Sequence, residues 1–199
     1  MSPNKDPKKN RSGLKGPTFG IADNFPNRHM WKEIAEERKG EFKITHDPGR
    51  TYEIHTVSIP YKKWSIVITV SDARPLRFLV AFSSLQDFNL TISWEDFIEK
   101  IIKKFGKPEI EVGWKEFDDR YLIKTNHSDT AKRILSKDIQ KALLKHNVNS
   151  VTYHTDKKTH TAELRSLIQR HAGNREMINE LIGMHEALID NLESSKTIH

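Results

Sequence analysis

The chain has 199 residues, of which 36% are hydrophobic and 30% charged, and a formal net charge of +6. This length is ordinary for one domain, and no run of about 18 apolar residues could span a bilayer. The absence of cysteine excludes disulfides, thiolate zinc sites and cysteine nucleophiles. The first residues, MSPNKDPKKNRSG, lack the apolar segment of a secretory signal, so we expect a bacterial-type cytoplasmic protein.

Residues 1–26 are rich in Lys, Asn, Pro and Gly and contain few apolar side chains, which predicts a disordered basic tail. Within residues 1–20, five cations face a single acid, Asp6; they are Lys5, Lys8, Lys9, Arg11 and Lys15. Residues 1–20 therefore hold +4 of the net charge of +6. Residues 27–199 should form a single folded domain without the concentrated positive charge typical of a nucleic-acid-binding body.

The first part of this domain should be one helix followed by four strands. The pattern predicts a helix over 28–39, capped by Asn27 and ended by a left-handed Gly40. Alternating apolar residues then predict strands within 41–46, 51–59, 62–72 and 76–85. Their connections are too short for parallel crossovers, so these strands should be antiparallel. The face that carries Trp64, Ile66 and Ile68 needs a helical cover.

The next segment predicts a short strand and an amphipathic helix. Residues 89–93 should extend or edge the sheet, and Ser93 should cap a helix over Trp94–Phe105. Its apolar stripe is Phe97, Ile98, Ile101, Ile102 and Phe105. Four lysines near its end are candidate binding residues, although a solvated helix end also explains them: Lys100, Lys103, Lys104 and Lys107.

The stretch from Glu109 to Leu144 predicts strand, tight connection, strand and two helices. Phe117, Tyr121 and Ile123 share one parity, which indicates one strand face. Ser128 lies where a helix N-cap is expected, and Asp129 follows in the first turn, where a carboxylate favours the helix dipole. Buried stripes are expected from Ala131, Ile134 and Leu135 in the first helix, and from Ile139, Ala142, Leu143 and Leu144 in a second helix opened by Ser136.

This stretch resembles a motif of bacterial domains of unknown function. The motif is an FD-x-x-[FY]-x-[IV] strand followed by an A-x-x-[IL]-L-[ST] helix start. Its residues here are Phe117, Asp118, Tyr121, Ile123, Ala131, Ile134, Leu135 and Ser136. The resemblance extends to Glu180–Leu192 and so covers roughly the second half of the chain. It implies no activity and no residue roles.

The C-terminal part predicts a strand through Val151 and Tyr153, a turn over 156–159, and a helix from Gly173-Asn174 to Leu192. Residues 161–171 fit either a helix or a strand, and we favour a strand over 162–169. A single helix over 161–193 would repeat apolar or histidine side chains every seven residues, as in a coiled coil. Gly173 lies inside that helix and argues against it.

Three groups of polar residues could carry chemistry. His154, His160 and His171 match no metal-ligand spacing. His127-Ser128-Asp129 contains the residue types of a catalytic triad, but adjacent residues cannot align them. Asp118-Asp119, with Glu111 and Glu116 nearby, is the best carboxylate cluster, although a catalytic pair would need an apolar pocket that raises one pKa. A polar turn explains this cluster better, so we predict no catalytic, metal or cofactor site. Candidate binding residues are Trp114, Asp118, Asp119 and the four lysines.

The sequence thus predicts an α+β fold, with a mainly antiparallel, curved sheet covered by several helices. It favours a non-enzymatic binding or protein-interaction domain, whose partner is another protein or a small apolar ligand. Weak nucleic-acid binding through the basic tail is the first alternative. A hydrolase that uses the Asp118-Asp119 region is the second.

Overall fold

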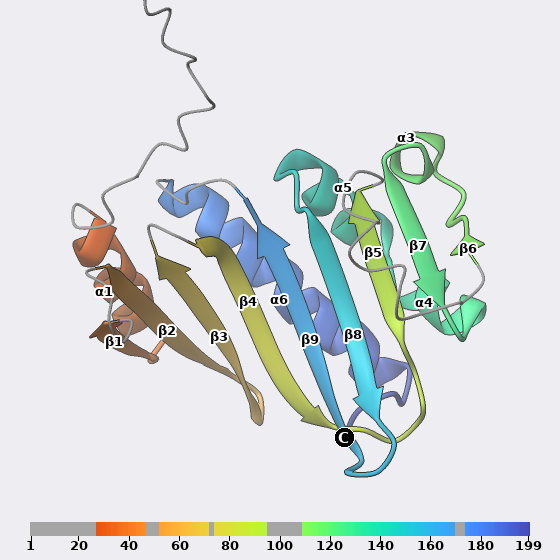
Figure 1. Ribbon diagram of the computed structural model, residues 1–199, viewed down its shortest axis with the longest axis horizontal. Helices are drawn as coiled ribbons and strands as arrows, with labels where there is room; N and C mark the ends of the chain where they lie inside the picture. The colour runs from red at the N-terminus through yellow and green to blue at the C-terminus, as the bar shows by residue number, and fades with distance from the viewer. Residues whose placement is uncertain (1–26, 47–51, 72–73, 95–108, 170–173) are drawn as a thin grey trace, which may run out of the picture.

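The structure is a computed structural model that describes residues 27–46, 52–71, 74–94, 109–169 and 174–199 (Figure 1). The strands in this part of the chain are β1 (Glu41–His46), β2 (Glu53–Tyr61), β3 (Trp64–Ser71), β4 (Arg74–Ser83), β5 (Leu90–Trp94), β6 (Glu109–Ile110), β7 (Tyr121–Thr125), β8 (Ser150–Asp156) and β9 (Thr161–Ile168). The helices are α1 (Arg28–Glu37), α3 (Lys115–Asp118), α4 (Ser128–Ile134), α5 (Lys137–Lys145) and α6 (Arg175–Ser194).

All nine strands form one sheet in the order β1-β2-β3-β4-β9-β8-β5-β7-β6. Every neighbouring pair is antiparallel, so the predicted α+β fold with an antiparallel sheet is confirmed. The first four strands are consecutive neighbours, as their short connections require. The hairpin of β8 and β9 then inserts between β4 and β5, which joins the two halves of the chain in one sheet.

One face of the sheet, here called the helix-covered face, holds the core. Its central row of cross-strand neighbours runs through every strand: Phe42, Val57, Ile68, Phe78, Ser166, Val151, Ile92, Ile123 and Ile110. Trp64, Ile66 and Ile68 are buried on this face, and Figure 1 shows α6 crossing behind the central strands. The helical cover expected for these three residues is therefore present.

α6 is fixed to the centre of this row by His185. The imidazole is fully buried and stacks on Phe78 with ring centroids 4.2 Å apart. Its Nδ1 lies 2.7 Å from the Leu181 carbonyl oxygen, and its Nε2 lies 2.9 Å from Ser166 Oγ. The carbonyl can only accept, so Nδ1 carries the proton and Nε2 accepts from the serine hydroxyl.

The strand predicted over 162–169 is confirmed as β9, which excludes a coiled coil over 161–193. β9 pairs with β4 along eight residues, and a helix here would leave the edge of β4 unpaired. The predicted C-terminal helix is confirmed as α6. Its N-cap, Asn174, accepts a hydrogen bond from the Glu176 amide.

Several local predictions are wrong. Phe117 lies in the short helix α3 and not in a strand, and its burial comes from packing there. Ser128 is the first helical residue of α4, after His127 at the N-cap, and makes no capping bond. Ser93 and Trp94 belong to strand β5. The rest of the helix predicted over Trp94–Phe105 lies outside the described residues, as does the predicted tail, 1–26.

The end of α1 also differs from its prediction. The left-handed residue is Lys39, with φ of 54°, and not Gly40. Gly40 is needed for a different reason, because a Cβ there would lie 2.3 Å from the Ser58 carbonyl oxygen of β2. The chain therefore enters β1 in close contact with β2. In the part of the chain described, no helix is long and apolar enough to cross a membrane.

Candidate functional site

The predicted residues Trp114, Asp118 and Asp119 all lie near α3, at the β6 end of the sheet. Asp118 accepts two backbone hydrogen bonds, from the Val112 amide to Oδ1 and from the Gly113 amide to Oδ2, each 2.9 Å long. Gly113 has φ of +88°, a left-handed conformation that favours glycine. Asp118 therefore holds the turn that leads from β6 into α3.

Asp119 does not act together with Asp118. Its carboxylate lies 3.4 Å from Lys115 Nζ, and its side chain is 65% exposed. It lines a separate surface depression with Glu116, Arg120 and Lys145. The structure thus brings the two adjacent acids to different surroundings, without the shared apolar pocket that a catalytic carboxylate pair needs.

Trp114 contributes to packing between α3 and α5. The Lys137 ammonium lies 3.2 Å from the centre of its indole ring, within the range of a cation–π contact. The ring also packs against the core. The four candidate lysines, Lys100, Lys103, Lys104 and Lys107, lie outside the described residues.

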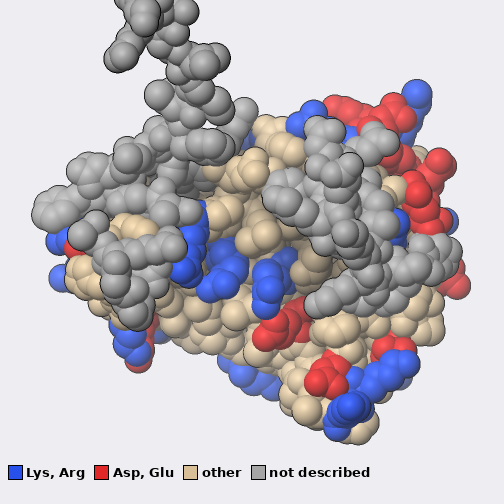
Figure 2. Space-filling model, in the orientation of Figure 1, with Lys and Arg blue, Asp and Glu red and all other residues tan. Residues whose placement is uncertain are grey.

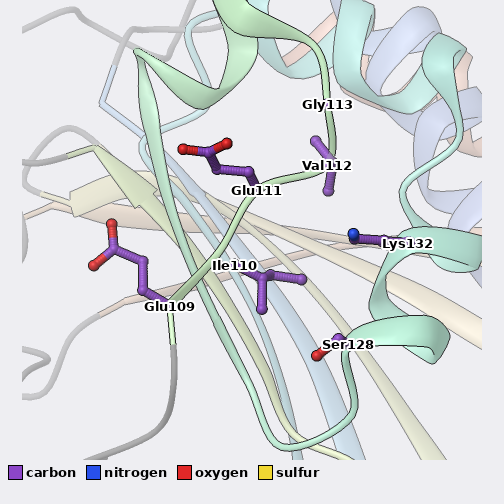
Figure 3. Close-up of a pocket in the computed structure, with 7 residues that line it drawn as sticks. All are labelled: Glu109, Ile110, Glu111, Val112, Gly113, Ser128 and Lys132. Carbon is purple, nitrogen blue, oxygen red and sulfur yellow. The ribbon is translucent and has the colours of Figure 1, made fainter.

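A surface hollow of about 710 Å³ lies beside these residues, between β6 and α4 (Figure 3). Ile110 and Val112 form its apolar part, and both pack partly against the core. Ser128 and Lys132 of α4 line the opposite side. Figure 3 shows the Lys132 amino group directed from α4 towards the β6 segment, and the Glu109 and Glu111 carboxylates directed away from it.

The sheet's own architecture creates this hollow. Ile110 is the last member of the apolar row on the helix-covered face, next to Ile123, and β6 is the last strand of the sheet. α4 extends the helical layer there, so the row ends at the surface instead of beneath a further strand. The sequence did not single out Ile110, Val112 or Lys132, because the hollow requires that α4 fold back beside the edge strand.

Lys132 is exposed. Neither its amino group nor the Ser128 hydroxyl has a polar partner among the described residues.

Tyr121 is a buried residue at the start of β7. Its hydroxyl lies 2.8 Å from the carbonyl oxygens of both Leu143 and Val148, and burial raises its pKa to about 12. These contacts join the start of β7 to the end of α5 and to Val148.

The opposite face of the sheet carries more polar side chains, beside partly buried apolar ones such as Val67 and Leu79. It carries Arg77 on β4 and Arg165 on β9, and Figure 2 shows Lys and Arg side chains gathered in the middle of this face. Arg165 forms an ion pair with Glu163, 2.8 Å away, which reduces the local excess of charge. Thr69 on β3 and Thr152 on β8 are partly exposed on the same face.

The described residues contain no group of three or more His, Asp or Glu side chains arranged to hold a metal ion. His154 contacts Asn89, with Nδ1 and Oδ1 2.6 Å apart, and His171 lies outside the described residues. His55 is buried and its Nε2 lies 3.0 Å from Glu53 Oε2. Hydrogen bonds from His55 and Arg28 lower the pKa of Glu53 despite the opposing effect of its desolvation.

Comparison with known proteins identifies a fold and no family. No family model matches the chain, and no curated protein matches it. Among solved structures, the chain is similar to the crystal structure of the mycobacterial trehalose monomycolate transport factor A, TtfA, with a TM-score of 0.54 and 8% sequence identity. The similarity covers 86% of this chain and 97% of that one. At this identity, the comparison shows that the two proteins share a fold.

Proposed function

We propose that this protein is a non-enzymatic protein-interaction domain that binds a partner protein at the hollow between β6 and α4. One observation carries the proposal: the apolar row of the core reaches the surface at Ile110, beside Val112 and the ammonium of Lys132, which has no partner in the described part of the chain. Such a place can accept an apolar side chain and a neighbouring carboxylate from the partner. Apolar anchors with a polar rim are the usual composition of an interface centre.

The form of the hollow favours a protein over a small apolar ligand. Sites for small ligands commonly enclose most of the ligand surface, whereas five of the seven residues that line this hollow are exposed; they are Glu109, Glu111, Gly113, Ser128 and Lys132. A ligand there would stay largely in water. A protein segment can instead cover the hollow with its own surface and exclude the water.

Two further observations support binding over catalysis. Both oxygens of Asp118 accept backbone hydrogen bonds, which accounts for this residue without a chemical role. The solved structure of similar fold is that of a transport factor, a description that is compatible with a non-enzymatic binding domain here.

Selection of displayed random peptides against the full-length protein tests this proposal. We expect binders that place an apolar residue next to an acidic one. Val112→Asp and Lys132→Glu should each weaken them by about tenfold or more. Leu85→Asp is the matched control, because Leu85 is an exposed apolar residue that does not line the hollow. Selected peptides that bind both hollow variants as tightly as the wild type would contradict the proposal. A small molecule that co-purifies and is lost from Val112→Asp would favour the apolar-ligand alternative.

A further inference from the structure

The other edge of the sheet, β1, has the properties of a pairing surface. β1 has six residues, and among the described strands it pairs with β2 alone. Ile44 on this strand is 38% exposed, one of two large exposed hydrophobic residues in the described part of the chain. Edge strands present unpaired backbone groups, and natural proteins commonly protect them with very short strands, bulges, proline or charged side chains. The two charges of β1, Glu41 and Lys43, have opposite signs. β1 is regular and longer than the β6 edge strand.

The backbone direction of β1 follows from the hairpin that joins β2 and β3. Tyr61 and Trp64 face each other across a two-residue connection, an arrangement in which the flanking residues form a hydrogen-bonded pair. Alternate residues of β2 then direct their backbone groups to β3, and those between, including Ser58 and Thr56, direct theirs to β1. The close approach of the Ser58 carbonyl to Gly40 agrees with this assignment.

Glu41 and Lys43, which face Ser58 and Thr56, therefore form their backbone hydrogen bonds with β2. Phe42 and Ile44 direct theirs towards the free edge. The side chains of these residues alternate between the two faces of the sheet. Phe42 and Ile44 lie on the helix-covered face, and Glu41 and Lys43 lie on the opposite face. A new strand at this edge would meet both an apolar and a charged row.

We propose that β1 pairs with β1 of a second copy of this chain, antiparallel across a two-fold axis at Phe42. Such an axis, perpendicular to the sheet, keeps the helix-covered faces of both copies on the same side and joins the two sheets into one. Closed two-fold pairing is the commonest symmetry of homo-oligomers. The two copies would exchange hydrogen bonds through the Phe42 backbone, and their Phe42 rings would lie next to each other.

The charges on β1 favour pairing with another β1 strand and determine which residues face each other. With the axis at Phe42, Glu41 of each copy faces Lys43 of the other, a favourable cross-strand pair that occurs twice. An axis at Lys43 would place two ammonium groups opposite each other. An axis at Ile44 would place Lys43 opposite Thr45, and Glu41 opposite position 47, beyond the end of β1. In the single chain, Lys43 Nζ and Glu41 Oε2 are 2.8 Å apart and both side chains are 70% exposed. Both charges are therefore accessible to a second copy.

Sedimentation of the full-length protein over a range of concentrations tests the pairing. We expect a reversible monomer–dimer equilibrium. Glu41→Lys and Lys43→Glu should each raise the dimer dissociation constant by about tenfold, because each creates like-charge pairs. The double variant should restore it, since the charges are only exchanged. Glu163→Lys on β9, also exposed, is the matched control. A protein that stays monomeric, or a dimer unaffected by both single variants, would overturn the proposal.

Cysteine cross-linking tests the register independently, because the chain has no native cysteine. At a two-fold axis through Phe42, the two Cα atoms of that residue would be about 5.5 Å apart, as in a hydrogen-bonded pair, which a disulfide can bridge. Under a mild oxidant, Phe42→Cys should form a covalent dimer and Ile44→Cys should not. Cross-linking through residue 44 alone would refute the axis at Phe42. If Phe42→Cys fails to fold, the charge-exchange series still decides.

Discussion

His185 should make the stability of this protein depend on pH in a defined window. The imidazole is fully buried between α6 and the sheet and is neutral, with the Nδ1 proton donated to Leu181 and the Nε2 lone pair accepting from Ser166. Burial lowers its pKa from 6.5 to about 4. A proton on Nε2 would remove the acceptor for the serine hydroxyl and place a charge in the core.

The size of the effect follows from this difference in pKa. As pH falls below 6.5, the unfolded chain binds a proton at His185 and the folded chain does not, until the pH nears 4. Protonation therefore favours unfolding within this window. A difference of about 2.5 pH units corresponds to about 3 kcal/mol. The full stability is present above pH 6.5, and this part of it is lost by pH 4.

Chemical denaturation at several pH values, for the wild type and for His185→Gln, measures this contribution. The glutamine variant should be less stable at pH 7, because it loses the stacking on Phe78. It should also lack the histidine contribution to acid destabilisation. The difference in unfolding free energy between the two proteins should therefore shrink by about 3 kcal/mol from pH 7 to pH 4. Carboxylates such as Glu53 and Glu180 titrate in both proteins and cancel. A difference that does not change with pH would refute the reasoning.

Three further predictions concern the core, the acidic turn and the tail. Ile123→Ala should reduce the unfolding free energy by about 2–5 kcal/mol, since Ile123 is fully buried; a loss below about 1 kcal/mol would show that β7 is not core. Asp118→Asn should cost about 1 kcal/mol in the same assay, because the amide replaces a charged acceptor of two bonds. A hydrolase screen that finds an activity lost in this variant would instead support catalysis. Deletion of residues 1–24 should leave the melting temperature unchanged and abolish nucleic-acid affinity; binding that persists at physiological salt would assign it to the folded body.

The candidate site was predicted only in part. The sequence drew attention to the region near Asp118, because the residue types and the turn are local. It gave no reason to choose Ile110 or Val112, since each is a single apolar residue in a short extended segment. Lys132 resembles any exposed lysine of a helix. These three residues form one surface only because α4 packs beside the edge strand.

Phe117 shows why the alternation of apolar residues over a few positions can predict the wrong secondary structure. Its parity matched that of Tyr121 and Ile123, which suggested a common strand face. The bonds from the Val112 and Gly113 amides to Asp118 instead close a turn that starts α3. A side-chain acceptor of this kind competes with strand formation over a few residues. The spacing of apolar residues contains no information about such a hydrogen bond.

Within the described residues, the sequence by itself determined the class of most long elements, the antiparallel meander of β1–β4 and most of the buried residues. These features depend on apolar periodicity and on connections too short for a crossover, which are local properties. Only the tertiary structure decided that the β8–β9 hairpin joins β4 to β5, that β1 and β6 form the two edges, and that the apolar row ends in a hollow. Strand order depends on pairing between segments far apart in the chain, and alternation along one strand carries no information about which neighbour it will meet.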